Sequence, residues 1–187
     1  MSDKRVRKAS HSFQFNVAQL LKQPTGARRI YDLAAADVPS LDEAVKVAAP
    51  YHGRVRLTRI GTGILVTGEL QTTVELECTH CLATFLGEMR FEVEEEFRPT
   101  LDIASGTWLP PDPDQDVATL IDEHHILDLA EVVRQNLLLS LPSSPICRPD
   151  CRGLCPYCGQ NRNEGSCDCR TEEVDSRWAG LKASFEQ

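Results

Sequence analysis

Residues 64–97 have the sequence ILVTGELQTTVELECTHCLATFLGEMRFEVEEEF, and their pattern predicts the main elements of the sheet. Apolar or small residues occupy every second position in two runs, a period that predicts β-strands with one buried face. Thr79 and His80 separate the runs, which is the length of a tight hairpin loop. We therefore expect a long antiparallel hairpin with Cys78 and Cys81 at its tip. The runs are Ile64, Val66, Gly68, Leu70, Thr72, Val74, Leu76 and Cys78, then Cys81, Ala83, Phe85, Gly87, Met89, Phe91, Val93 and, after Glu95, Phe97.

Helical patterns flank the hairpin on both sides. A short helix is predicted over residues 13–21, with Asn16 as a cap and Pro24 after its end. Residues 40–47 fit a helix or a strand equally well, and the prolines and aspartates of residues 100–116 indicate a loop. Asp128-Leu-Ala-Glu131 resembles a capping box and predicts a helix to about residue 141, which Pro142 closes. A last short helix is predicted over residues 174–185.

Together these elements predict an α+β fold, in which an antiparallel sheet with a long hairpin is flanked by helices and followed by a zinc-knuckle segment. We divide the chain into three parts. Residues 1–50 form a basic N-terminal segment with a short helix, residues 51–142 form the sheet and helix core, and residues 143–187 form a cysteine-rich zinc segment. The chain has 187 residues, of which 41% are hydrophobic, enough for a real core.

The cellular compartment determines how the cysteines are interpreted. The charged start of the chain is followed by no apolar run, so no secretory signal is expected. The sequence also contains no stretch approaching the roughly 18 apolar residues of a membrane span. We expect a cytoplasmic protein, in which thiols stay reduced and closely spaced cysteines indicate metal ligands rather than disulfides.

The eight cysteines form four close pairs: Cys78 with Cys81, Cys147 with Cys151, Cys155 with Cys158, and Cys167 with Cys169. Two thiolates at such spacings reach one zinc ion from a single turn, and zinc prefers four ligands in a tetrahedron. We therefore predict two zinc ions, each held by four cysteine thiolates. Pro156 and Gly159 favour a tight turn around the third pair, as in a zinc knuckle. The alternative for Cys78 and Cys81 is that they are ordinary buried residues, because free cysteine is often buried.

The preferred partition of the pairs follows from loop length. Cys155, Cys158, Cys167 and Cys169 are close in sequence, so bringing them to one ion costs little chain entropy. This leaves Cys78 and Cys81 to share the second ion with Cys147 and Cys151. The other two pairings stay open, and the histidines at positions 80, 124 and 125 are weaker candidates for a metal site.

Charge is distributed unevenly along the chain, which has a net charge of −8. Residues 1–60 contain 11 Lys or Arg and 5 Asp or Glu, whereas residues 61–146 contain 3 and 16. A contact with RNA is therefore expected in the basic N-terminal third, if anywhere. The acidic middle argues for a basic protein partner at least as strongly, although solvated acidic residues are the alternative.

Three stretches of the chain resemble the YceD family, whose bacterial and plastid members are linked to accumulation of large-subunit ribosomal RNA. They are residues 16–21 (NVAQLL), 77–85 (ECTHCLATF) and 151–169 (CRGLCPYCGQNRNEGSCDC). The resemblance implies a role in assembly or maturation of the large ribosomal subunit, with ribosomal RNA or a large-subunit ribosomal protein as the partner. It supplies no catalytic residue.

The leading hypothesis is a non-enzymatic zinc-binding factor that supports accumulation of large-subunit ribosomal RNA. A redox-sensitive zinc chaperone, or an adaptor for a basic ribosomal protein, is the alternative, because oxidants open thiolate zinc sites. We do not expect an enzyme. A catalytic zinc keeps an open coordination position, and the sequence contains neither a glycine-rich phosphate loop nor a nucleophile elbow.

Overall fold

The computed structural model describes residues 6–10, 13–35, 45–110 and 113–169, and these residues divide between two compact units. The first unit spans Met1–Leu76 and Thr84–Ser143, and the second spans Glu77–Ala83 and Ser144–Gln187. The helix predicted over residues 174–185 and most of the ambiguous residues 40–47 lie outside the described residues. The helices within the described residues are too short or too polar to cross a bilayer.

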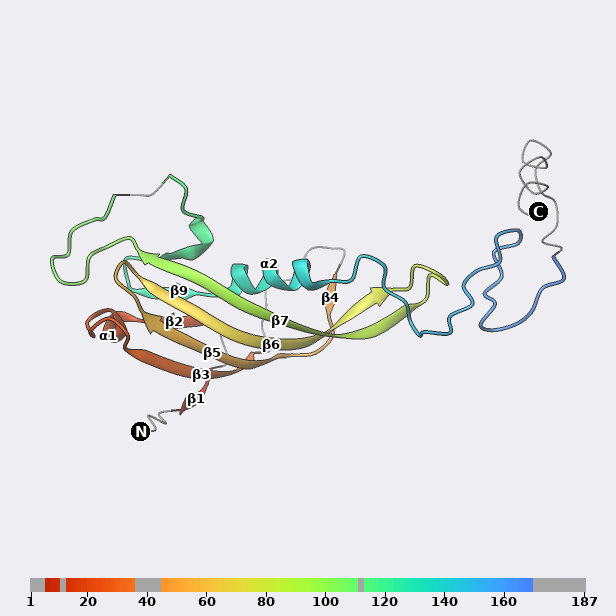
Figure 1. The fold of residues 1–187 in the computed structure, drawn as a ribbon, viewed down its shortest axis with the longest axis horizontal. Coiled ribbons are helices and arrows are strands. Elements are labelled where there is room, and N and C mark those ends of the chain that lie inside the picture. The colour runs from red at the N-terminus through yellow and green to blue at the C-terminus, as the bar shows by residue number, and fades with distance from the viewer. Residues whose placement is uncertain (1–5, 11–12, 36–44, 111–112, 170–187) are drawn as a thin grey trace, which may run out of the picture. The chain divides into compact units, whose positions relative to one another are not determined.

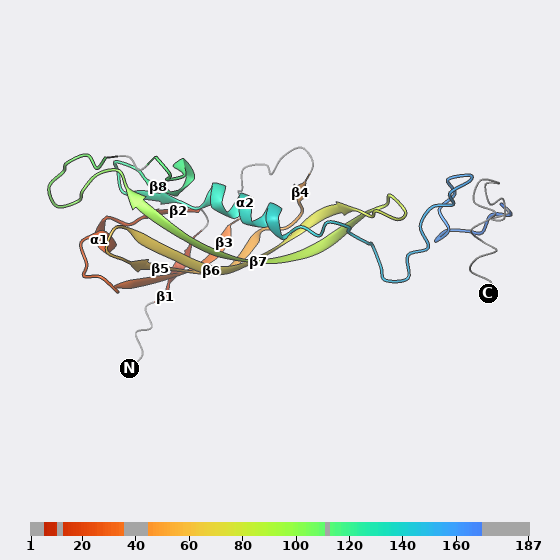
Figure 2. The same ribbon diagram turned by 45° about the horizontal axis from the view of Figure 1, so that its top comes forward.

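A mixed β-sheet forms the body of the first unit (Figures 1 and 2). Its strand order among the described residues is β1-β3-β5-β6-β7-β8, and β4 pairs with β6. β3, β4, β5 and β6 pair antiparallel, whereas the β1–β3 and β7–β8 pairs are parallel. The strands are β1 (Val6–Ser10), β3 (Arg28–Ala35), β4 (Lys46–Val47), β5 (Tyr51–Arg59), β6 (Ile64–Glu77), β7 (Thr84–Pro99) and β8 (Leu120–Ile121).

The alternation seen in the sequence is the burial pattern of β6 and β7, which are neighbours in the sheet. In β6 the residues Ile64, Val66, Leu70 and Val74 are fully buried. In β7 the side chains that alternate with the buried ones include exposed glutamates. The expected class of fold is therefore confirmed at the level of an α+β protein dominated by β-sheet, but the sheet is mixed rather than purely antiparallel.

A smaller layer covers the buried face of the sheet. It contains α1 (Ala18–Leu21), α2 (Ala130–Ser140) and a two-stranded sheet of β2 (Gln14–Asn16) with β9 (Ile126–Asp128). Helix α2 packs on β7, and Figure 1 shows it lying along the sheet. The residues buried from this layer are Phe13, Phe15, Val17, Leu20, Leu21, Leu127, Leu129, Val132, Val133 and Leu137.

The two helix predictions differ in outcome. The segment predicted as one helix over residues 13–21 is a strand followed by a single helical turn, because β2 pairs with β9. The N-cap of this turn is Val17 rather than Asn16, although Asn16 Oδ1 accepts a hydrogen bond from the amide of Ala18 at 3.2 Å. The second helix is confirmed and ends before Pro142.

The capping box predicted over residues 128–131 is wrong, because the helix begins at Ala130 with Leu129 as its N-cap and has no side-chain cap hydrogen bond. Asp128 Oδ1 accepts from the amide of Ala130 at 2.9 Å. Glu131 instead binds Arg134, with 2.6 Å between Oε1 and Nη2. An opposite charge one turn away holds Glu131 in preference to the backbone amide that a capping box requires.

Candidate metal centres

The turn between β6 and β7 presents two thiols in the second unit. It spans residues 78–83 and is closed by hydrogen bonds from the amide of Leu82 to the carbonyl of Cys78 at 2.9 Å and from the amide of Cys78 to the carbonyl of Ala83 at 3.0 Å. Leu82 takes a left-handed backbone conformation, with φ of 58°. The prediction of a two-residue loop was therefore wrong. Both sulfur atoms of this turn belong to one group of four closely placed thiols.

Residues 144–154 lie directly beside this turn. The amide of Thr79 donates to the carbonyl of Pro145 at 2.9 Å, and the amide of Leu154 donates to the carbonyl of His80 at 2.9 Å. Gly153 has φ of 68°, and a Cβ at this position would lie 2.8 Å from the carbonyl oxygen of His80. Glycine is therefore required for this close approach, which carries Cys147 and Cys151 to the turn.

The four sulfur atoms of Cys78, Cys81, Cys147 and Cys151 lie within 4.8 Å of one another. The Sγ–Sγ distance is 3.8 Å for Cys78 and Cys151 and 3.7 Å for Cys81 and Cys147. Zinc–sulfur bonds of about 2.3 Å place the corners of a tetrahedron about 3.8 Å apart, so the spacing matches a four-thiolate site. A disulfide requires about 2.05 Å, and none links these residues.

The second group is built from Cys155, Cys158, Cys167 and Cys169, whose sulfur atoms also lie within 4.8 Å of one another. Gly159, with φ of 73°, closes the first turn through a hydrogen bond from its amide to the carbonyl of Cys155 at 2.9 Å. The amide of Cys155 donates to the carbonyl of Gln160 at 2.8 Å. The eight thiols thus gather into the two groups that loop length favoured, although the identity of a bound metal stays a prediction.

In each group the pKa of at least one thiol is lowered and that of at least one other is raised. Backbone amides of Cys158 and Tyr157 lower the pKa of Cys155 to about 6. A hydrogen bond that the Cys169 thiol donates to Cys158, together with burial, raises the pKa of Cys169 to about 12. Burial and hydrogen bonds with the other three thiols of its group raise the pKa of Cys147 to about 12. Four thiolates at this spacing repel one another, so a bound cation is what allows all four to ionise together.

Asn163 contacts the first group but was not predicted from the sequence as part of the site. Asn163 donates from Nδ2 to the sulfur of Cys151 at 3.3 Å, and this hydrogen bond lowers the pKa of the Cys151 thiol against the effect of burial. Its Oδ1 accepts from the amide of Arg152 at 2.9 Å and from Arg148 at 2.8 Å. Such outer partners orient metal ligands and hold them in place. Its only signal in the sequence is its position between the last two cysteine pairs.

The histidines do not join either group in the described part of the chain. His80 is exposed in the turn and contributes its backbone carbonyl rather than its ring. His125 has φ of 58° and belongs to the first unit. The donor sets are therefore all sulfur, which suits zinc or a single iron ion.

The fold and the thiol groups define a class, namely β-sheet proteins that carry two four-cysteine groups suited to metal. The family model described as "Large ribosomal RNA subunit accumulation protein YceD" matches residues 66–183. The chain belongs to this family, as the resemblance of its motifs implied. The matched residues include all eight cysteines.

Similar proteins come from bacteria and plants. An uncharacterized protein of Mycobacterium tuberculosis is 35% identical over 127 residues, which cover 68% of this chain and 58% of that protein. A maize protein named large ribosomal RNA subunit accumulation protein YCED homolog 1, chloroplastic, is 24% identical over 178 residues, covering 82% of this chain and 60% of the maize protein. The chain thus spans less than two thirds of the length of these curated relatives. No solved structure matches it.

Proposed function

We propose that this protein is a non-enzymatic factor that binds two zinc ions and supports accumulation and maturation of large-subunit ribosomal RNA during ribosome assembly. The observation that carries the proposal is the match of the YceD family model to residues 66–183, a range that contains both four-thiol groups. Its expected partner is large-subunit ribosomal RNA or a large-subunit ribosomal protein.

The metal in this proposal is structural. β6 and β7 form one long hairpin with the first zinc ion at its tip, and residues 155–169 form a zinc knuckle around the second. Zinc neutralises thiolates that otherwise repel one another, so binding and folding of the second unit are coupled. Four sulfur ligands saturate each ion and leave no position for a water molecule that zinc might activate, which favours a binding role over catalysis.

The experiment that tests the function is depletion of the protein, followed by sedimentation of ribosomal particles and quantification of both ribosomal RNAs. We expect a deficit of large subunits and of the large ribosomal RNA relative to the small one, restored by the wild-type chain. A variant with Cys78, Cys81, Cys155 and Cys158 replaced by serine is expected not to restore it. A normal large-subunit profile after depletion would contradict the proposal.

One observation favours a redox-sensitive zinc chaperone as the second candidate. The two groups differ in exposure at one position, because Cys158 of the second group is exposed whereas no thiol of the first group is. Peroxide converts two thiolates of a group into one disulfide, is itself reduced to water, and releases the ion. Zinc release from the second group under mild peroxide, with suppression of aggregation of a client protein, supports this candidate. Full retention of zinc under the same conditions argues against it.

A further inference from the structure

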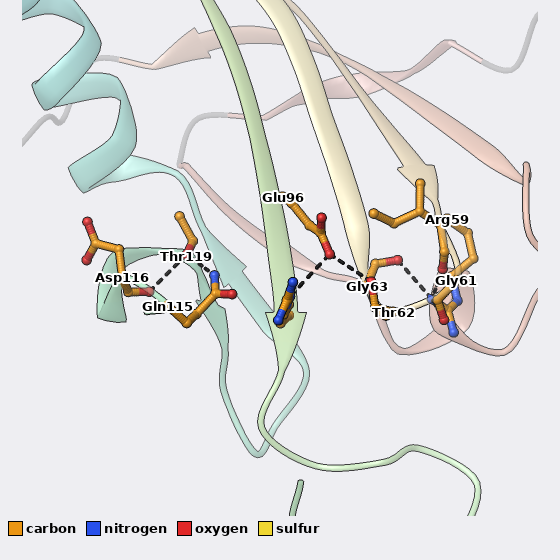
Figure 3. A network of polar contacts seen from close by, with 10 residues as sticks. Arg59, Gly61, Thr62, Gly63, Glu96, Gln115, Asp116 and Thr119 are labelled. Atoms are coloured by element: carbon orange, nitrogen blue, oxygen red, sulfur yellow. Dashed lines mark hydrogen bonds and ion pairs between the residues drawn. The ribbon is translucent and has the colours of Figure 1, made fainter. Parts of the chain in front are cut away.

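Two networks of polar side chains stand out among the described residues, and they differ in what they reach. The network in Figure 3 lies in the first unit, where Arg59 donates to the carbonyl of Gly63 at 2.9 Å and Thr62 Oγ1 donates to Glu96 Oε1 at 2.7 Å. Its members bind one another and nearby backbone, so it holds the turn between β5 and β6 to β7. The other network is centred on Asn163 in the second unit and extends to a candidate metal ligand.

By its place in the sequence, Asn163 belongs to the second four-thiol group. It lies on the loop between Cys158 and Cys167, and both of these cysteines are members of that group. An ion bound by the second group therefore fixes both ends of the loop. Within the loop, Asn161 Oδ1 accepts hydrogen bonds from the amide of Asn163 at 3.0 Å and from its Nδ2 at 2.9 Å. The loop thus sets the orientation of the Asn163 side chain.

By its contacts, Asn163 belongs to the first four-thiol group. Its Nδ2 donates to the sulfur of Cys151 at 3.3 Å, and its Oδ1 accepts from the amide of Arg152 at 2.9 Å and from Arg148 at 2.8 Å. Arg148 follows Cys147 in the chain and Arg152 follows Cys151, so these contacts span the segment that carries both cysteines. A side chain from the loop of the second group therefore supports half of the first group.

Backbone hydrogen bonds join the same two segments. The amide of Arg162 donates to the carbonyl of Gly153 at 2.9 Å, and Leu154 forms an isolated β-bridge with Asn161. The amide of Leu154 also donates to the carbonyl of His80, in the turn of the first group. The short connection between the two groups is therefore bonded on one side to the loop and on the other side to the turn.

We propose that Asn163 couples the two metal centres, so that an ion held by the second group strengthens the binding of an ion by the first. When the second group is filled, the closed loop holds Asn163 in position to donate to the sulfur of Cys151. When the second group is empty, the same contact requires the loop to be ordered at a cost in conformational entropy. The inference rests on the proposed binding of two ions and deepens it, because the two sites become a coupled pair.

The coupling acts in both directions, because the free energy that links two binding events is the same for each of them. An ion in the first group strengthens binding at the second by the same factor. Outer partners of metal ligands change metal affinity by about tenfold or more, so we expect a factor of about ten. Such a factor is small beside the affinity of a four-thiolate zinc site. Each group alone therefore keeps its ion when no chelator competes.

The test counts the zinc ions on the full chain by native mass spectrometry while a chelator lowers the concentration of free zinc under reducing conditions. We expect Asn163→Ala to weaken the binding of the ion that enters last about tenfold, and to leave the ion that enters first unchanged. Alkylation of the freed thiols, mapped by peptide mass spectrometry, identifies the group that is empty. Gln160→Ala removes an exposed amide side chain from the same loop and serves as the matched control, with both affinities unchanged.

A chain with one working group distinguishes coupling from an ordinary contact. The double substitution Cys158→Ser and Cys167→Ser disables the second group and leaves the first. In this chain we expect Asn163→Ala to change the zinc affinity of the first group by about twofold at most. A tenfold loss in this chain would overturn the proposal, because Asn163 would then support Cys151 without an ion in the second group. Unchanged zinc binding by the Asn163→Ala variant of the intact chain would overturn it as well.

Thermal unfolding of each variant is measured alongside to confirm that it is folded. Either contrary result leaves two zinc ions on the wild-type chain and leaves the depletion phenotype untouched. A wild-type chain that binds no zinc would instead contradict the proposed function, and the coupling with it. Failure of the coupling and failure of the proposed function are therefore distinguishable.

Discussion

At the scale of single residues, Tyr51 combines a well-packed ring with a hydroxyl that makes no hydrogen bond among the described residues. Its ring meets Phe13 edge-on with centroids 5.6 Å apart, but its hydroxyl is buried and has no hydrogen-bond partner among the described residues. Leaving a polar group in this state costs roughly 1–3 kcal/mol. We therefore expect Tyr51→Phe to raise the free energy of unfolding by about 1 kcal/mol, as measured by urea denaturation.

Tyr51 also predicts that the stability of the protein depends on pH in the alkaline range. Burial raises the pKa of Tyr51 from its ordinary 10.0 to about 12, so the folded state keeps the phenolic proton longer than the unfolded state. The contribution of the protonated Tyr51 hydroxyl to the free energy of unfolding is therefore fully present below pH 10. It is lost as the pH rises from 10 to about 12. The stability gained through Tyr51→Phe is therefore expected to grow across this window. A variant less stable than the wild type at neutral pH would show that the hydroxyl has a partner.

A substitution of Gly53 tests the close approach of β5 and β6. A Cβ at this position would lie 2.2 Å from the carbonyl oxygen of Glu69, which belongs to the neighbouring strand. Because this contact is with backbone, relief requires the strands to separate, and we expect Gly53→Ala to cost about 2 kcal/mol or more in unfolding free energy. Gly61→Ala is the matched control, because a Cβ there meets nothing within 4 Å. Equal effects of the two substitutions would contradict the close approach.

At the scale of elements, the strands were predictable and their connection was not. Alternation located β6 and β7 to within a few residues, because one face of each strand is buried and the other is exposed. The alternation extended the predicted strands too far, to Cys78 and Cys81. These residues alternate in step with the core residues but lie in a turn. Cysteine is a small apolar residue that can be buried either in a sheet or beside other thiols. Periodicity alone therefore does not distinguish these two environments.

The two thiol groups are separate elements of the second unit, and paired substitutions test this. We expect Cys155→Ser to release one zinc ion and to increase amide hydrogen exchange in residues 152–169, while the turn at residues 78–83 stays protected. Cys78→Ser is expected to release the other ion and to loosen that turn together with residues 144–151. If either substitution releases both ions, the groups are not independent in their occupancy.

At the scale of the whole molecule, the sequence was informative where signals are local. The eight ligand candidates, the helix after Asp128 and the proline-rich loop all follow from spacings within a few residues. The parallel pairing of β1 with β3 and the approach of Pro145 to Thr79 join segments far apart in the chain. No local pattern records such contacts. The pairing of Cys78 and Cys81 with Cys147 and Cys151 was reached only by elimination.

The central claim is that eight thiols hold metal in two four-sulfur sites, and metal analysis of the protein tests it most directly. The chain is purified without chelator and under reducing conditions, and zinc and iron are quantified against protein concentration, with native mass spectrometry to count ions per molecule. The account predicts two zinc ions per chain, one for each group of four thiols. A metal-free chain, or one whose cysteines are joined in disulfides, would contradict it.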